Sequence, residues 1–315
     1  MTEVFPLAGK RIWVAGHRGM VGSAIIRRLA REDVTVLTAD RATVDLARQG
    51  QVEDWLKTNQ PDAIVLAAAK VGGILANNTQ PADFLYQNLA IEMNVIEGAH
   101  RVGVDRLLFL GSSCIYPKLA AQPIREDALF TGPLESTNEA YAVAKIAGIK
   151  LCQAYRRQFG RDYVSAMPTN LYGPGDNFDL TTSHVLPALI RKAHEAKVGG
   201  AGELTIWGTG APRREFLHVD DCADALVLLL RSYSEAEHIN VGSGEDLTIL
   251  ELAELVARVV GFAGRIVTDP SKPDGTPRKL MSDARLRTRG WRPAISLAGG
   301  VALTYAWFLE REAKR

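Results

Sequence analysis

The sequence predicts a doubly wound α/β fold, in which helices cover both faces of a parallel sheet, with a smaller C-terminal α/β lobe. Short runs of strand-forming residues alternate with amphipathic helical segments through the first half of the chain. A glycine-rich turn joins the first strand to the first helix, which is typical of the Rossmann type of this fold. The 315 residues, 47% of them hydrophobic, suffice for a core divided between two lobes.

The elements of the first half follow from periodicity. We expect strands at residues 11–15, 34–38, 63–67, 107–110 and 163–167, and helices at residues 20–31, 51–58, 81–102 and 138–159. The first helix places Val21, Ile25 and Leu29 on one face. The third strand is entirely apolar, as expected where helices cover both faces of a parallel sheet.

The pattern changes after Leu171, where glycine and proline mark a loop at residues 173–177. Beyond it we predict helices at residues 185–196, 250–260 and 297–312, separated by loop-rich stretches. We therefore expect one domain at residues 1–175, to which residues 216–240 return, and a smaller lobe at residues 176–315.

The charge balance excludes two classes of partner. The formal net charge is +1, so the chain has no overall basic field for nucleic acid or for an anionic membrane.

The sequence shows neither a signal peptide nor a membrane span. The first nine residues contain Glu3 and Pro6 and do not read as a signal peptide. The most apolar stretches, at residues 64–69 and 225–230, are too short to span a bilayer.

The three cysteines, Cys114, Cys152 and Cys222, have no CxxC spacing and form an odd set. This pattern favours neither a disulfide framework nor a metal site. We expect a reducing compartment, and therefore a cytoplasmic protein without a bound metal.

The glycine-rich turn has the spacing GxxGxxG. It contains Gly16, Arg18, Gly19, Met20, Val21 and Gly22. Glycine at these positions lets the backbone approach a pyrophosphate, and the helix N-terminus supplies free N–H donors. A strand–helix turn without a ligand could use the same residues, but the strand before it and the helix after it favour a dinucleotide site.

The residues after the second strand bear on the choice of dinucleotide. Asp40 could hold the ribose hydroxyls of NAD, while Arg41 could accommodate the extra phosphate of NADP. Arg18 adds a second cation within the glycine turn. Two arginines against one aspartate favour NADP(H), unless these residues are simply solvated surface charges.

Tyr141 and Lys145 form a YxxxK pair, whose spacing puts both side chains on one face of a helix. A tyrosine has an ordinary pKa of about 10, so proton exchange near neutral pH needs on the order of 4 kcal/mol of phenolate stabilisation. The nearby ammonium and an oxidised nicotinamide ring can supply it. Ser112 follows the fourth strand, at the sheet edge where ligands bind, and could hydrogen-bond a substrate oxygen beside Tyr141. It could also simply cap the next turn.

Longer stretches of the sequence narrow the class of protein. They lie at residues 67–74, 76–79, 111–118 (GSSCIYPK), 168–174 (PTNLYGP), 214–221 (REFLHVDD) and 272–279 (KPDGTPRK). With the features above, the chain resembles the GDP-L-fucose synthases, a family of extended short-chain dehydrogenases, over nearly its whole length. The resemblance implies epimerisation of C3 and C5 of GDP-4-keto-6-deoxy-D-mannose, then reduction of C4 by NADPH.

The same resemblance implies catalytic roles for Cys114 and His184, as the base and acid of the epimerisation. A thiol and an imidazole can both exchange protons near neutral pH. Without the resemblance, each would read as a structural residue. Cys152, Cys222 and His218 keep that structural interpretation.

The resemblance also implies further contacts. Those to the cofactor are Leu110, Gly111, Lys145, Pro168, Asn170, Leu171 and His184, and those to the GDP-sugar are Lys192, Trp207, Arg214, Asp274 and Lys279. Lys192 stands where the family leads us to expect Arg, and the expected His after Phe178 is missing. The helices at residues 81–102 and 138–159 are expected to form a four-helix bundle in a homodimer.

Other functions are compatible with the same fold. A sugar-nucleotide dehydratase would carry a carboxylate between Ser112 and Tyr116, and this chain has none there. A UDP-sugar 4-epimerase would not need Cys114 or His184. A related epimerase or reductase acting on another sugar nucleotide stays open. A non-catalytic NADP(H) sensor is disfavoured because the chain retains Tyr141 and its partners.

Overall fold

The computed structural model describes residues 3–272 and 274–313. Its largest sheet is parallel throughout, with strand order β2-β1-β3-β4-β5-β9. The strands are β1 (Lys10–Ala15), β2 (Val34–Leu37), β3 (Ala63–Leu66), β4 (Arg106–Leu110), β5 (Asp162–Pro168) and β9 (Ile239–Val241). This arrangement confirms the predicted Rossmann-type fold and the five strands expected in the first half.

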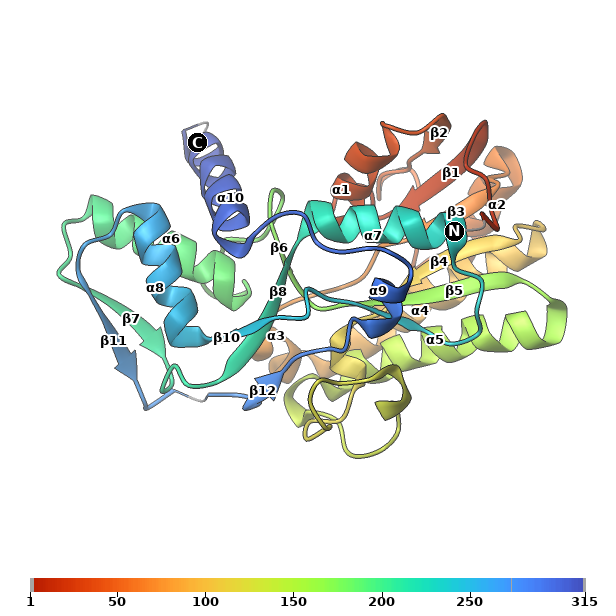
Figure 1. The fold of residues 1–315 in the computed structure, drawn as a ribbon. Coiled ribbons are helices and arrows are strands. Elements are labelled where there is room, and N and C mark those ends of the chain that lie inside the picture. The colour runs from red at the N-terminus through yellow and green to blue at the C-terminus, as the bar shows by residue number, and fades with distance from the viewer. Residues whose placement is uncertain (1–2, 273, 314–315) are drawn as a thin grey trace.

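Helices cover both faces of this sheet. One face carries α1 (Met20–Leu29) and α7 (Val219–Ser232), and the other carries α2 (Gln49–Asn59), α4 (Pro81–Arg101) and α5 (Glu139–Phe159) (Figure 1). The apolar β3 shows why: Ala63 and Val65 enter the core beneath α1 and α7, while Ile64 and Leu66 enter the opposite core. Because successive strand residues point to opposite faces, a strand buried on both sides must be apolar throughout.

A second lobe has its own core (Figure 1). Its helices are α6 (Val185–Val198), α8 (Ile249–Val260) and α10 (Leu297–Glu312). Its strands are β6 (Asn170–Tyr172), β7 (Glu203–Trp207), β8 (Arg213–His218), β10 (Asp246–Thr248), β11 (Arg265–Asp269) and β12 (Arg278–Lys279). Leu186 of α6, Leu252 of α8 and Phe308 of α10 belong to this core.

The sequence interpretation missed these short strands and two short helices, α3 (Ile74–Thr79) and α9 (Ala284–Thr288). Elements this short contain too few residues to display a helical or strand period. The long helices that were predicted were placed well: α10 has the predicted bounds, and α1 ends two residues before the predicted Arg31. No helix bounds were predicted for α7, which the sequence analysis had only assigned to the returning segment 216–240. In the described parts of the chain, no helix has the length and apolar content that a bilayer crossing requires.

Candidate active site

The glycine turn forms a close-packed cradle at the carboxyl end of β1. Gly16 has φ +95°, and a Cβ there would lie 2.6 Å from the backbone nitrogen of Ala68. A Cβ at Gly22 would collide with the carbonyl oxygen of Gly16. Gly19 is the N-cap of α1 and provides no side-chain cap, so the first N–H groups of the helix, from Met20 onward, are left for a ligand. These features fit the pyrophosphate of a dinucleotide.

The charged residues beside the cradle pair with one another. Arg18 Nη2 lies 3.0 Å from Asp40 Oδ2, and Arg41 Nη2 lies 3.8 Å from Asp45 Oδ2. Hydrogen bonds from Thr43, with the Arg18 charge, hold the pKa of Asp40 below its ordinary value. Arg18 and Arg41 are both largely exposed, so either guanidinium could turn toward a phosphate without leaving water.

The remaining predicted cofactor residues gather at the carboxyl edge of the large sheet. They are Leu110 at the end of β4, Gly111 just beyond it, Pro168 at the end of β5, and Asn170 and Leu171 on β6. A Cβ at Gly111 would collide with the sulfur of Met167, so a larger residue would require that buried side chain to move. Asn170 donates to the carbonyl oxygen of Glu215 at 2.8 Å, which fixes its amide.

Tyr141 and Lys145 lie one turn apart on α5, as the YxxxK spacing predicts. The Lys145 ammonium donates to the carbonyl oxygen of Leu110 at 3.0 Å and lies 5.8 Å from the centre of the Tyr141 ring. Burial raises the pKa of Tyr141 well above its ordinary value, while a hydrogen bond with Ser112 lowers it. Ser112, Tyr141 and Lys145 therefore lie together beside the end of β4.

Cys114 belongs to the same cluster. It lies in a short 3-10 turn (Ser113–Ile115), and its backbone N–H donates to the Ser112 hydroxyl at 3.4 Å. Burial raises the pKa of the Cys114 thiol, and the charges of Lys279 and Lys145 oppose that rise. A buried thiol that faces two ammonium groups can gain and lose a proton more readily than one buried in an apolar core.

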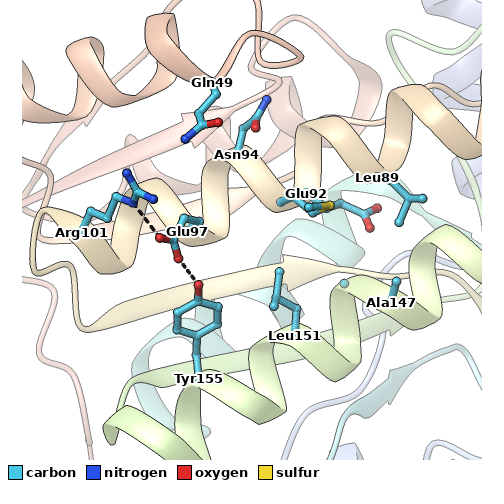
Figure 2. A pocket seen from close by; sticks show the side chains of 11 residues that line it. Gln49, Leu89, Glu92, Asn94, Glu97, Arg101, Ala147, Leu151 and Tyr155 are labelled. Atoms are coloured by element: carbon cyan, nitrogen blue, oxygen red, sulfur yellow. Dashed lines mark hydrogen bonds and ion pairs between the residues drawn. The ribbon is translucent and has the colours of Figure 1, made fainter.

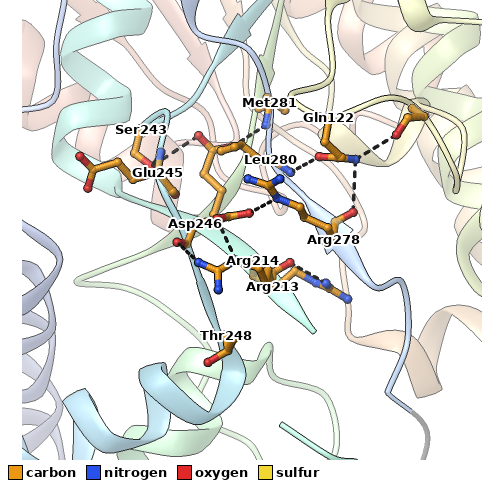
Figure 3. A network of polar contacts seen from close by, with 12 residues as sticks. Gln122, Arg213, Arg214, Ser243, Glu245, Asp246, Thr248, Arg278, Leu280 and Met281 are labelled. Atoms are coloured by element: carbon orange, nitrogen blue, oxygen red, sulfur yellow. Dashed lines mark hydrogen bonds and ion pairs between the residues drawn. The ribbon is translucent and has the colours of Figure 1, made fainter. Parts of the chain in front are cut away.

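Lys279 lines the same small pocket as Cys114, although β12 belongs to the second lobe. β12 pairs in parallel with β8, which places Lys279 beside Arg214 in the register. Asp246 holds both strands: its carboxylate accepts from Arg213 Nε at 3.0 Å and from Arg278 Nε at 2.5 Å (Figure 3). This ion pairing attaches the segment that contains Lys279 to β8 and so keeps Lys279 in the pocket that Cys114 also lines.

His184 is the N-cap of α6 and lies at the surface of the second lobe. The protein around the ring lowers the pKa of His184 by desolvation. The preceding residues contact the first domain, since Gly73 N donates to the Thr182 carbonyl oxygen at 3.1 Å. The structure thus holds this segment against the loop after β3, but no direct contact joins His184 to Cys114 among the described residues.

The predicted GDP-sugar residues fall into two groups. Lys192 of α6 lies 5.3 Å from the ring centre of Trp207, whose side chain is 56% exposed and offers a flat surface for a base. Arg214 lies beside Lys279, deeper in the crevice. Asp274 accepts from the backbone N–H and the hydroxyl of Thr209, at 2.7 and 2.8 Å.

The three residues to which the sequence analysis gave a structural role, His218, Cys152 and Cys222, have contacts that fit that role. His218 is the N-cap of α7, where its Nδ1 accepts from the Asp220 N–H at 3.2 Å. Cys152 and Cys222 are buried within α5 and α7. No group of three His, Cys, Asp or Glu residues in the described part of the chain is placed to bind a metal ion.

Sequence reasoning missed Glu92 and Asp176. Glu92 of α4 is buried and forms an ion pair with Lys145, and its signal was a charge within the apolar face that holds Val95 and Ala99. Asp176 follows Gly175 near the start of α1, and burial raises its pKa to about 7. No sequence pattern marks a loop aspartate as buried.

The fold and this crevice define a dinucleotide-dependent enzyme of the epimerase and dehydrogenase class. A model of the NAD dependent epimerase/dehydratase family matches residues 12–242. The GDP-L-fucose synthase of Sinorhizobium fredii is 66% identical over 98% of this chain and 99% of its own length. GDP-L-fucose synthase 1 of Arabidopsis thaliana is 59% identical over 100% of this chain and 98% of its own length.

A solved GDP-L-fucose synthetase from Naegleria fowleri, bound to NADP, gives a TM-score of 0.91 at 28% identity, covering 99% of this chain and 97% of that one. The chain therefore belongs to the NAD dependent epimerase/dehydratase family and, within it, to the GDP-L-fucose synthases. The predicted family is confirmed, and the family relationship identifies the cofactor as a nicotinamide dinucleotide.

Proposed function

We propose that this protein converts GDP-4-keto-6-deoxy-D-mannose to GDP-L-fucose, by epimerising C3 and C5 and then reducing C4. The observation that carries the proposal is the cluster of Ser112, Cys114, Tyr141 and Lys145 at the end of β4, in a chain 66% identical to a GDP-L-fucose synthase. The same crevice therefore contains the groups that transfer protons in the epimerisation and in the reduction.

The epimerisation needs a base and an acid on opposite faces of the sugar ring. Cys114 removes the proton next to the ketone, and His184 returns one from the other face. Ser112 and Tyr141 donate hydrogen bonds to the enolate oxygen that forms between these steps. The Lys279 charge stabilises the Cys114 thiolate, since it opposes the effect of burial on that thiol.

The reduction involves the C4 oxygen of the sugar, which is also the enolate oxygen of the epimerisation. The bound nicotinamide cofactor supplies the hydride to C4. Tyr141 donates its phenolic proton to the C4 oxygen, and Lys145 stabilises the phenolate that remains. Lys145 is fixed for this task by its hydrogen bond to the Leu110 carbonyl oxygen at 3.0 Å.

We assign the cofactor as NADP(H). The exposed guanidinium of Arg18 lies at the mouth of the glycine cradle, where it can meet the 2′-phosphate while Asp40 remains hydrogen-bonded to Thr43. Arg41, beside it, offers a second cation. The cofactor would occupy residues 1–175 with 216–240, and residues 176–315 would bind the sugar nucleotide through Lys192, Trp207, Arg214, Asp274 and Lys279.

We also propose a homodimer through α4 and α5. The outer face of these helices exposes Tyr86, Met93 and Val143, by 68%, 56% and 42%. It also carries a groove of about 470 Å³ lined in part by Leu89, Met93 and Leu151 (Figure 2). Apolar side chains exposed along two adjacent helices fit a second copy, which would complete a four-helix bundle. A Met93→Glu variant should elute as a monomer in size-exclusion chromatography, whereas the unmodified protein elutes as a dimer.

The decisive experiment follows NADPH oxidation by its near-ultraviolet absorbance with GDP-4-keto-6-deoxy-D-mannose. UDP-4-keto-6-deoxyglucose and NADH are run in parallel. We expect rapid oxidation with the GDP sugar and a product of fucose configuration. Binding of NADPH without oxidation of any combination would refute the proposed activity.

Tyr141→Phe tests the reduction step. Loss of the phenolic proton should lower C4 reduction by about 10²- to 10⁴-fold, because that is the usual contribution of a general acid. NADPH binding should change little. Turnover close to that of the unmodified enzyme would remove Tyr141 from the assigned step.

A further inference from the structure

The catalytic lysine has a buried ionic partner on a neighbouring helix. Lys145 Nζ lies 3.0 Å from Glu92 Oε1, and the two side chains are 2% and 1% exposed. An ammonium has three N–H groups. The Leu110 carbonyl oxygen accepts from one of them, and the Glu92 carboxylate lies at ion-pair distance from the nitrogen, so the ammonium can still donate toward Tyr141 or a ligand in the crevice.

Gly148 provides the space that this arrangement needs. A Cβ at Gly148 would lie 2.8 Å from Glu92 Oε2 and 2.5 Å from Cζ of Phe109. Glycine inside a helix destabilises it by about 0.5–1 kcal/mol relative to alanine. Gly148 nevertheless lies in the middle of α5, at the position that faces the Glu92 carboxylate.

Fold stability is a weak explanation for the pair. Replacing a buried ion pair by apolar residues of similar size is often neutral or stabilising. Neither carboxylate oxygen of Glu92 has a hydrogen-bond partner among the described residues, which makes the carboxylate costly to bury. Its contact with Lys145 is therefore best explained by what it does for that lysine.

The other ionisable groups near Glu92 are occupied or uncharged. On α4, Glu97 accepts from Arg101 at 2.6 Å and from the hydroxyl of Tyr155 (Figure 2). Burial raises the pKa of Tyr141 and of Cys152 on α5, and the negative charge of Glu92 raises both further. Cys114 lies beyond Lys145, and Phe109 and Leu110 of β4 carry no ionisable group. Lys145 is thus the cation that pairs with Glu92.

We infer that Glu92 is a positioning residue for C4 reduction: it holds the Lys145 ammonium in place beside Tyr141. The inference rests on the proposed function, since it assigns Lys145 to the reduction step. It also predicts that Glu92 matters much less for epimerisation, in which Tyr141 donates a hydrogen bond but gives up no proton.

The test compares Glu92→Gln with the unmodified full-length protein. C4 reduction is followed as NADPH oxidation across pH, and epimerisation as deuterium uptake from solvent at C3 and C5. We expect the ratio of reduction to exchange to fall at least about tenfold, because a small displacement of a catalytic group commonly lowers the rate by that much or more. The alkaline limb of reduction should move to lower pH, because the Glu92 charge helps to raise the pKa of Tyr141, the proton donor.

Glu97→Gln is the matched control. It removes a carboxylate from the same helix and the same groove, but one that pairs with Arg101 and Tyr155 instead of Lys145. Its reduction-to-exchange ratio and its pH profile should equal those of the unmodified protein.

Gly148→Ala is a second variant, because Glu92→Gln leaves a buried ammonium unpaired and could unfold the protein. The added methyl crowds the Glu92 carboxylate and the Phe109 ring, both of which contact Lys145, without removing the carboxylate charge, so reduction should fall more than exchange at every pH. Unchanged reduction in folded Glu92→Gln, or an equal loss of exchange and reduction in both variants, would overturn the inference. An unmodified protein that neither exchanges nor reduces would instead refute the proposed function.

Discussion

The guanidinium of Arg18 lies 3.0 Å from the carboxylate of Asp40, so the cation of the glycine turn is paired with the acid that follows β2. Asp40 is held there by the backbone N–H and hydroxyl of Thr43, at 2.9 and 2.8 Å. The acid is therefore already hydrogen-bonded, whereas Arg18 remains mostly exposed and can turn toward an incoming phosphate.

Arg18→Ala should weaken NADPH binding by about tenfold, because an exposed charge-assisted hydrogen bond contributes roughly 1.5 kcal/mol. NADH binding should change little, since NADH lacks the 2′-phosphate. Fluorescence titration of both cofactors measures the two constants. An equal loss for NADPH and NADH would show that Arg18 contacts the shared part of the cofactor.

Cys114→Ser should abolish deuterium exchange at C3 and C5, because a serine hydroxyl cannot act as the base near neutral pH. NADPH binding should persist. Mass spectrometry of the sugar nucleotide measures the exchange. Cys152→Ala is the control, since that thiol is buried in α5 away from Ser112, and normal exchange in Cys114→Ser would rule out the assigned base.

Asp246→Ala should release Arg213 and Arg278 and so loosen the strand that carries Lys279. We expect a loss of about 1–3 kcal/mol in the free energy of unfolding, because two guanidinium groups lose a nearly buried partner. Exchange at C3 and C5 should fall with it. Urea denaturation and the exchange assay check the two effects. Asp269→Ala, which removes a carboxylate that accepts from Ser271, should leave exchange unchanged.

Asp176→Asn should remove a pH-dependent cost to stability. The pKa of Asp176 is raised to about 7 in the folded protein, from an ordinary value of 3.8. Between these values the unfolded chain releases the proton that the folded protein retains, so the free energy of unfolding falls as pH rises. Above about pH 7 the cost is constant, on the order of 4 kcal/mol.

The asparagine variant lacks this ionisation, and its Oδ1 can still accept from the Asn177 N–H, as Asp176 does at 2.7 Å. Relative to the unmodified protein it should gain stability as pH rises from about 4 to about 7, and the gain should be constant above that. Thermal or urea denaturation at several pH values provides the comparison. A stability difference that does not vary with pH would contradict the raised pKa.

Local patterns determined much of this protein. The alternation of buried strands with amphipathic helices predicted the large sheet, because burial on both faces requires apolar strands such as β3. The i, i+4 spacing predicted that Tyr141 and Lys145 share a face of α5. The glycine turn predicted the cradle at α1, because its backbone geometry excludes larger side chains.

Only the tertiary structure decided which distant residues meet. Lys279 lines one pocket with Cys114 because β12 pairs with β8, and Glu92 pairs with Lys145 because α4 packs against α5 with Gly148 between them. Such contacts join residues far apart in the chain, so no local spacing records them. Burial likewise depends on everything packed around a group, which is why the pKa of Asp176 followed from the fold and could not be read from its neighbours in sequence.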